Sequence, residues 1–327
     1  MAFIFLDRFS RDGGVLAGLV GIFLKACVMF PFAYTQAGIA RKNTMNVDCA
    51  DTGYLEKYSE TLPQAIHLVR LAQYLLANHG GYSTLRMLFG DALRRAYDEV
   101  IDMPRTGRWS LAQLEKTEKT YVGTKVEILV RHALGLPKGN RLDLLIDGTE
   151  VDIKNTVRST WTIPREAVGE VCLVVRGDDK ASTFSAGLLW ARAEFLTTRP
   201  NQDGKVTVNA GRGMSTILWL VNEGALPPNL FEAMTEADRN HILDPSVGGK
   251  VRLVRLFRIY QGVEIPRHII LSVAQQKDPM KRLRKNGGAR DLLSTEGLTL
   301  FSGKWDADEL QRRNTLIASD SFICLHV

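Results

Sequence analysis

The segment RLDLLIDGTEVDIK, residues 141–154, decides the fold that we expect. Asp147-Gly148 lies between two runs rich in apolar residues, and Asp-Gly in this setting is a strong signal for a tight hairpin turn. We therefore expect two short antiparallel strands joined at that turn. Because side chains alternate between the faces of a strand, Asp152 and Lys154 point the same way. Asp143, on the paired strand, is expected to lie near them.

Two carboxylates and one ammonium group in a small volume suggest a specific chemistry. Neighbouring carboxylates repel each other unless a cation, a proton or the lysine neutralises them. Carboxylate oxygens suit Mg²⁺, which keeps several waters and often binds substrate phosphate. An adjacent lysine can orient an attacking water. These are the parts needed for metal-assisted phosphodiester hydrolysis. The alternative is a solvated strand face, which is the commoner meaning of an isolated Asp-X-Lys.

A third acid, Glu127, favours the catalytic interpretation. Ser110 is a candidate N-cap for a helix that runs to about Leu134 with an approximate apolar stripe. Because this helix leads directly into the hairpin, the Glu127 carboxylate is expected to reach the same site. The alternative is a surface acid paired with Lys125 or Arg131.

The composition is that of an ordinary globular protein. The chain has 327 residues, 45% of them hydrophobic and 24% charged, and its length suggests two domains. The net charge of +6 and the pI of about 9.1 favour an anionic partner. The cysteines show no C-x-x-C spacing, so no zinc site is indicated and a reducing cytoplasm is expected. Cys172, inside an apolar run, is expected to be a buried thiol.

Residues 1–59 are expected to form an N-terminal appendage of open status. Residues 15–24 are apolar, but Lys25 would lie near the centre of any spanning helix, which is costly. Acids near the start and the lack of a clear cleavage pattern disfavour a signal peptide. We prefer a translation start at Met45, or a peripheral appendage, to a membrane anchor.

The rest of the chain predicts a mixed α/β (α+β) fold. Residues 60–103 carry a helical apolar stripe that Gly80-Gly81 interrupts, and residues 104–107 are expected to form a turn. Residues 168–175 read as a buried strand, and residues 185–195 as another strand or a short helix. This order suits a mixed sheet flanked by helices. The expected division is a first domain at 60–198, a linker at 199–212 and a second domain at 213–327.

The second half contains a dense basic segment. Between Lys250 and Arg290 the sequence has eleven Lys and Arg but only two acids, a net charge of +9. Residues 265–273 read as a strand, and residues 280–285 as a basic helix or turn that leads into another helix. Such a cluster can neutralise several phosphates and predicts salt-dependent nucleic-acid binding. The alternative, a solvated basic face, is less consistent with so lopsided a charge.

Polar and basic residues of both halves are candidates for DNA contact. The glutamines can read base edges, although phosphate or structural contacts are commoner for a single glutamine. In the first half the candidates are Arg105, Arg108, Lys116 and Lys119. In the second half they are Gln275, Gln276, Lys277, Lys281, Arg282, Arg284, Lys285 and Arg290.

The chain closely resembles the NaeI restriction endonuclease family from about Asp91 to about Gly303. Two separate blocks in the right order make this resemblance more specific than the Asp-X-Lys pattern alone. The first block comprises the segments RTGRW (105–109), KTEKT (116–120), GTKVEI (123–128), VDIK (151–154), CLV (172–174) and AGL (186–188). The second comprises VAQQ (273–276), MKR (280–282) and GGAR (287–290).

The resemblance implies a PD-(D/E)xK nuclease core followed by a C-terminal DNA-binding domain of the winged-helix, CAP-like type. The catalytic set of the family falls on Glu127, Asp143, Asp152 and Lys154. In that scheme Asp143 and Asp152 hold Mg²⁺, Glu127 assists in holding the metal, and Lys154 orients the water. The resemblance also implies a homodimer that binds two copies of double-stranded DNA, one as substrate and one as effector. From Asn155 onward the loop is dissimilar, so the recognised bases stay open.

The resemblance therefore predicts a type II restriction endonuclease that makes Mg²⁺-dependent, sequence-specific double-strand breaks. Two alternatives remain at this point. One is a nicking or mismatch-repair nuclease on the same core. The other is a catalytically inert DNA-binding regulator, which the four filled catalytic positions disfavour.

Overall fold

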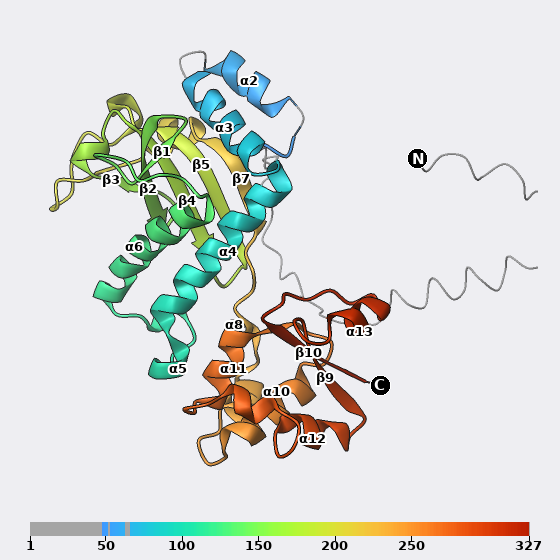
Figure 1. The fold of residues 1–327 in the computed structure, drawn as a ribbon. Coiled ribbons are helices and arrows are strands. Elements are labelled where there is room, and N and C mark those ends of the chain that lie inside the picture. The colour runs from blue at the N-terminus through green and yellow to red at the C-terminus, as the bar shows by residue number, and fades with distance from the viewer. Residues whose placement is uncertain (1–47, 52, 63–65, 327) are drawn as a thin grey trace, which may run out of the picture. The chain divides into compact units, whose positions relative to one another are not determined.

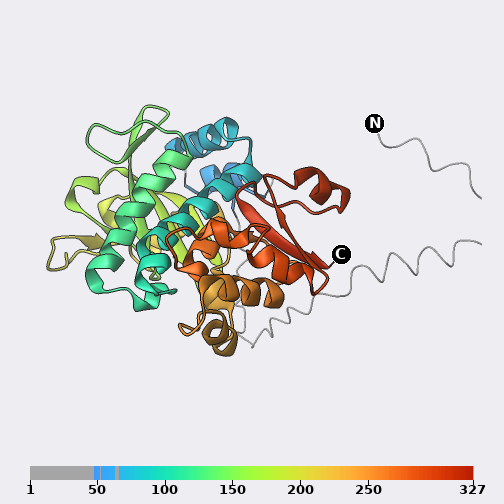
Figure 2. The same cartoon turned by 60° about the horizontal axis from the view of Figure 1, so that its bottom comes forward.

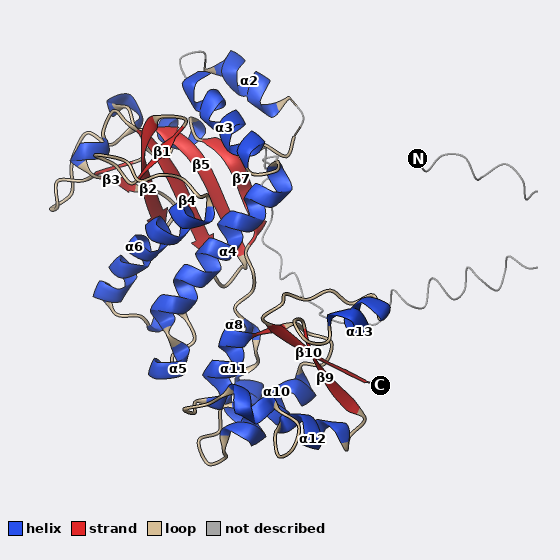
Figure 3. Cartoon of the chain, viewed as in Figure 1, coloured by secondary structure: helices blue, strands red, loops and turns tan. Residues whose placement is uncertain are grey.

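The computed structural model describes residues 48–51, 53–62 and 66–326, which belong to one compact unit. Expectations for residues 1–47, including the start at Met45, lie outside the described residues. Among the described residues, no helix has the length and apolar character needed to cross a membrane. The architecture combines a mixed sheet with helices, as the sequence predicted (Figures 1 and 3).

A five-stranded sheet carries the candidate site, and its strand order is β1-β2-β4-β5-β7. Strands β2 and β4 run parallel, whereas the other neighbours run antiparallel. Two further strands, β3 (Thr162–Ile163) and β6 (Val206–Thr207), form a separate ribbon. The strands of the main sheet are β1 (Leu144–Ile146), β2 (Thr149–Thr156), β4 (Val171–Asp178), β5 (Thr183–Trp190) and β7 (Leu218–Ala225).

The predicted hairpin is confirmed. Asp147 and Gly148 both have positive φ, 48° and 75°, which is the backbone of a type I′ turn and explains why Asp-Gly stands there. Leu144 pairs with Val151 across the two strands. This register places Asp143, the residue before β1, opposite Asp152.

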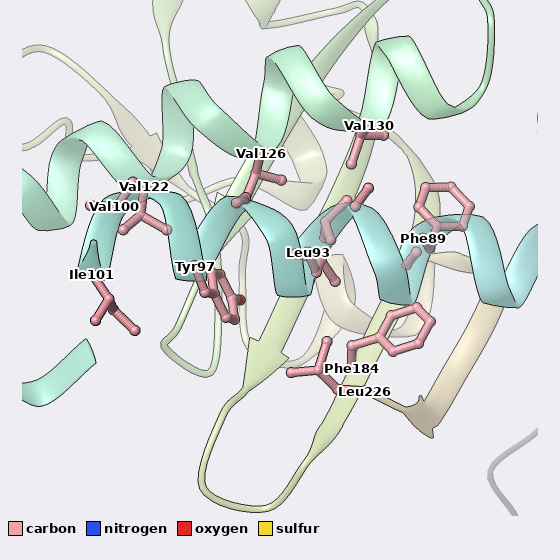
Figure 4. Close-up of a cluster of buried hydrophobic side chains, with 14 of the residues drawn as sticks. Phe89, Leu93, Tyr97, Val100, Ile101, Val122, Val126, Val130, Phe184 and Leu226 are labelled. Atoms are coloured by element: carbon pink, nitrogen blue, oxygen red, sulfur yellow. The ribbon is translucent and has the colours of Figure 1, made fainter. Parts of the chain in front are cut away.

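Helices cover one face of the sheet. They are α3 (Ile66–Asn78), α4 (Tyr82–Ile101) and α6 (Lys116–Ala133), and α4 and α6 lie side by side (Figures 1 and 2). Figure 4 shows Leu93 and Tyr97 of α4 with Val126 of α6 among the buried side chains that join these layers. Gly80 and Gly81, both with positive φ, separate α3 from α4 as predicted. The apolar stripes of these helices are thus their buried faces.

The opposite face of the sheet has a separate, smaller core. Cys172, Val174 and Leu189 pack there with the fully buried Trp161. Cys172 is fully buried, which confirms the buried thiol that the sequence predicted, and burial raises the pKa of this thiol.

The first described residues pack against the same sheet. In α2 (Tyr54–Thr61) the Tyr58 hydroxyl donates to the Thr216 carbonyl at 2.6 Å. The Asn222 amide of β7 likewise donates to Asp48 at 2.7 Å. Strand β7 follows the segment 199–212, where a linker was expected. The sheet therefore extends past that segment to Ala225.

Residues 226–326 form mostly short helices and a three-stranded sheet of order β8-β10-β9. Its strands are β8 (Ile265–Pro266), β9 (Leu298–Ser302) and β10 (Ser321–His326). The helices are α8 (Leu230–Ala233), α9 (Glu236–Ile242), α10 (Gly249–Ile259), α11 (Arg267–Ala274), α12 (Ala289–Ser294) and α13 (Ala307–Arg312), and α7 (Arg212–Ser215) precedes β7.

Three local expectations were wrong. Residues 265–273 are mainly helix α11, because Ile269, Ile270 and Val273 bury one helical face; a short apolar run does not distinguish strand from helix. Residues 103–106 form the short helix α5 rather than only a turn. Ser110 caps a single 3₁₀ turn at 111–113, and α6 begins later, where Glu115 forms a capping box with Glu118.

Candidate active site

The structure brings the four predicted catalytic side chains together at the hairpin. Lys154 Nζ lies 2.9 Å from Asp152 Oδ2, 3.8 Å from Glu127 Oε1 and 4.0 Å from Asp143 Oδ2. Glu127 comes from α6 and Asp143 from the residue just before β1. Asp152 and Lys154 both come from β2. The lysine is therefore central to a group of three carboxylates.

Strand geometry explains why Asp152 and Lys154 share a face. Ile153, between them, is fully buried in the core on the helix-covered side. The neighbours of Asp152 and Lys154 in register on β4 are Cys172 and Val174, which belong to the other core. The predicted alternation along β2 is thus confirmed.

Asp143 is fixed by backbone contacts. Its Oδ2 accepts a hydrogen bond from the Ile153 amide at 2.7 Å, and Arg131 donates to its carbonyl oxygen at 3.2 Å. The alternative pairing of Glu127 with Lys125 or Arg131 is not what the structure shows, because Lys125 pairs with Glu99 instead. Glu127 is left facing Lys154.

The charges of the site perturb one another. Burial, together with repulsion from Asp143 and Asp152, raises the pKa of Glu127 to about 7. Burial also raises the pKa of Asp152 to about 6, against the opposing effect of Lys154. Burial alone would lower the pKa of Lys154, but the surrounding carboxylates raise it, so the lysine stays protonated. The site has three carboxyl groups and one ammonium group, so Lys154 alone cannot neutralise it when all three are ionised.

The donor set fits a divalent cation such as Mg²⁺. Asp152 Oδ2 is buried and accepts no hydrogen bond of good geometry, although Lys154 lies near it. No group of three or more His, Cys, Asp or Glu side chains in the described part of the chain is arranged to hold a metal alone. Mg²⁺ commonly takes one or two carboxylates and completes its shell with water and substrate phosphate. Asp143 and Asp152 would supply those carboxylates.

The predicted DNA-contacting residues of the first half lie near the start of α6 and just before it. Arg105 is largely exposed and pairs with Asp102 at 2.6 Å. Arg108 forms two hydrogen bonds of 2.6 Å with Glu118, so its guanidinium group is already bound within the protein and is less available to DNA. Lys116 and Lys119 are exposed in the first turn of α6.

The predicted residues of the second half lie between α11 and α12, except for Arg290, which lies in the first turn of α12. Gln275 ends α11 and its Oε1 accepts from Arg252 at 2.9 Å, while Gln276 Oε1 accepts from Arg282 at 2.6 Å. Arg290 pairs with Asp306 at 3.4 Å. Among the predicted cations of the second half, Arg282 is exposed but donates to Gln276, and those that are exposed with neither an ion pair nor a side-chain hydrogen bond to another described residue are Lys277, Lys281, Arg284 and Lys285.

Sequence reasoning missed two residues around the site. Arg131 was considered only as a partner of Glu127, and Glu150 was not considered at all. Glu150 accepts backbone hydrogen bonds from the loop that precedes Asp143. Glu150 lies on β2 opposite Leu145 of β1, so its contact with the loop could be predicted only from the register of the hairpin.

Comparison with known proteins identifies the family of the chain. The family model described as restriction endonuclease NaeI matches residues 86–319, from α4 to just before β10. A curated relative, the "Type II restriction enzyme NaeI" of Lentzea aerocolonigenes, is 36% identical over 222 residues, which cover 66% of this chain and 69% of that protein.

These matches define the class of protein as a type II restriction endonuclease, a site-specific deoxyribonuclease whose substrate is DNA. Within that class, the chain belongs to the NaeI restriction endonuclease family. The predicted resemblance and the predicted enzyme class are thus confirmed. Enzymes of this class generally use a divalent metal ion.

Proposed function

We propose that this endonuclease makes sequence-specific double-strand breaks with Mg²⁺ at Glu127, Asp143, Asp152 and Lys154, on a PD-(D/E)xK core. The observation that carries the proposal is the convergence of three carboxylates on Lys154 within 4.0 Å. The core would comprise residues 48–225, since β7 completes its sheet.

The residues have distinct roles in this proposal. Asp143 and Asp152 hold the cation, which when bound neutralises the phosphodiester in the transition state and makes water more acidic. Lys154 stays protonated, so it orients the attacking water and donates to it or to the scissile phosphate. Glu127 keeps the lysine in place and completes the negative charge that attracts the cation.

Plasmid cleavage tests the site. Wild type and Asp152→Ala are compared on mixed-sequence DNA in Mg²⁺, with Asp203→Ala, an exposed acid in a turn, as the matched control. Losing a metal carboxylate should lower the rate by about three powers of ten or more, while the control cuts normally. Equal cutting by all three proteins would refute the site assignment.

The products of the same reaction separate the related activities. Breaks in both strands at one site support the proposal, whereas breaks in one strand indicate a nicking enzyme on the same core. Tight binding in Ca²⁺ with no product in Mg²⁺ or Mn²⁺ would indicate an inert DNA-binding protein. Mapping the ends on a large DNA also gives the recognised sequence.

We further propose that residues 226–327 form a winged-helix, CAP-like domain that binds a second DNA copy as effector, within a homodimer. Support comes from the unpaired cations between α11 and α12, Lys277, Lys281, Arg284 and Lys285. Short duplexes carrying the recognised site, added in trans, should then speed cutting of a slow site. Sedimentation at micromolar concentration tests the dimer, and a monomer that cuts at full rate would contradict it.

A further inference from the structure

The loop that delivers Asp143 is held by one side chain outside the proposed catalytic set. Glu150 Oε1 accepts the Asn140 amide hydrogen at 2.7 Å, and Glu150 Oε2 accepts that of Leu142 at 2.9 Å. The Arg141 amide, between them, lies 3.4 Å from both oxygens. One carboxylate therefore binds three successive backbone N–H groups.

A backbone hydrogen bond also joins the two ends of this loop, residues 137–145. The Leu145 amide donates to the Pro137 carbonyl at 2.9 Å, which joins the start of the loop to β1. Asp143 leaves this loop directly after the three captured amides, and its carboxylate is then bound by the Ile153 amide. Any movement of residues 140–142 is consequently transmitted to Asp143 through a single peptide unit.

The packing around Glu150 leaves no space for a larger residue beside it. A Cβ added to Gly139 would overlap Glu150 Oε2 and would lie 2.6 Å from the Leu142 carbonyl oxygen. The backbone hydrogen bonds from Leu142 and Asn140 also hold the pKa of Glu150 below its ordinary value, so its carboxylate is charged at neutral pH. Ionised acceptors make the stronger hydrogen bonds to backbone amides.

We propose that Glu150 is a positioning residue for the cleavage reaction: it clamps residues 140–142 and thereby holds the Asp143 carboxylate beside the Ile153 amide, where Asp143 and Asp152 would together hold a divalent cation. The inference rests on the proposed roles of Asp143 and Asp152. No ion pair joins Glu150 to Lys154 among the described residues, so Glu150 acts only through the loop.

Hydrogen exchange of the metal-free, DNA-free enzyme tests the clamp directly. In Glu150→Ala, peptides covering residues 138–143 should exchange about tenfold faster or more, because three amides lose their acceptor. Glu56→Ala is the matched control, an exposed acid of α2 that forms no ion pair with other described residues. Exchange at 138–143 equal to that of the control would overturn the clamp.

Kinetics tests whether the clamp matters for the reaction. A displaced metal carboxylate should lower kcat about 10- to 100-fold, while KM for DNA stays within about twofold because no DNA-contacting cation changes. Glu150→Gln retains one neutral acceptor oxygen and should recover part of the rate. A kcat for Glu150→Ala within twofold of the control, despite faster exchange, would overturn the positioning role.

Gly139→Ala provides an independent test because it keeps the Glu150 carboxylate but removes the space it occupies. It should show the same faster exchange and lower kcat, and wild-type behaviour would contradict the proposal. Asp143→Ala distinguishes the two proposals. If it cuts like wild type, the assigned catalytic site is wrong, whereas the exchange result still decides whether Glu150 holds the loop.

Discussion

At the scale of single residues, the side chains of the site do not neutralise one another. Three carboxylates face one ammonium group, and burial raises the pKa values of Glu127 and Asp152 toward neutrality. The folded protein therefore holds an unfavourable charge arrangement, which the proposed divalent cation would relieve. Stored electrostatic strain of this kind is expected where binding or catalysis needs it.

The first prediction concerns Glu127 and pH. Its folded-state pKa of about 7 exceeds its ordinary value of 4.5, so the carboxyl favours the folded state only while protonated, and that stability is lost as pH rises from 4.5 through 7. In EDTA, Glu127→Gln should therefore match wild type near pH 4.5 but be more stable at pH 8 by roughly 1–3 kcal/mol. Urea unfolding at the two pH values measures this, and an equal difference at both would contradict it.

The second prediction concerns metal removal. A ligand that binds only the folded state raises stability by about 2.7 kcal/mol at one hundred times its Kd. Saturating Ca²⁺, used in place of Mg²⁺ to prevent cleavage, should raise the melting temperature of wild type at pH 8 relative to EDTA. Asp152→Ala should show little of this rise, while the exposed-site control Asp203→Ala should keep it. A full rise in Asp152→Ala would argue against Asp152 as a ligand.

At the scale of elements, helix α6 carries Glu127 to the edge of the sheet. Val122, Val126 and Val130 fix the rotation of this helix by packing against α4 (Figure 4). The capping box of Glu115 and Glu118 fixes its start. The position of the Glu127 carboxylate thus depends on the core packing of its neighbour Val126.

Removing part of that packing should destabilise the protein. Val126 is fully buried, so Val126→Ala should cost about 2–3 kcal/mol from reduced burial and a residual cavity. Ile128→Ala is the control on the same helix, since its side chain is 42% exposed and should cost under about 1 kcal/mol. Guanidinium chloride unfolding compares them, and equal losses of stability would mean that α6 is not packed as described.

At the scale of the whole molecule, chemistry and DNA affinity are assigned to different stretches of the chain. The site lies on the five-stranded sheet, whereas the dense basic segment lies after Ala225. Several of its cations are engaged internally, including Arg258 with Glu296 and Arg290 with Asp306. In the proposed complex with DNA, the cations without an internal partner are the ones that would displace counterions from the phosphates.

This division predicts a change in salt dependence. In the full chain, Lys281→Ala, Arg284→Ala and Lys285→Ala together should flatten the slope of log affinity against log salt by about 0.9 for each phosphate that the protein no longer neutralises. Fluorescence anisotropy in Ca²⁺ from roughly 50 to 200 mM KCl covers the range in which such phosphate neutralisation matters. Lys180→Ala, on the β4–β5 turn, is the control. An unchanged slope would mean that these cations do not bind phosphate.

The sequence by itself determined the features that depend on neighbouring residues. The hairpin follows from Asp147-Gly148 and the shared face of Asp152 and Lys154 from strand alternation, because turn conformation and side-chain direction are local properties. Motif order was enough to predict the family. The run at 265–273 was misread because a short apolar segment buries equally well as strand or helix, and only its packing decides between them.

Only the tertiary structure decided what distant residues do together. It showed that Lys125 pairs with Glu99, which leaves Glu127 to Lys154. It placed β7 in the sheet beyond the expected linker, and it revealed Glu150 holding the loop before Asp143. Such contacts depend on strand register and on helix packing across the sheet, and these are set by the core as a whole rather than by the spacing of residues along the chain.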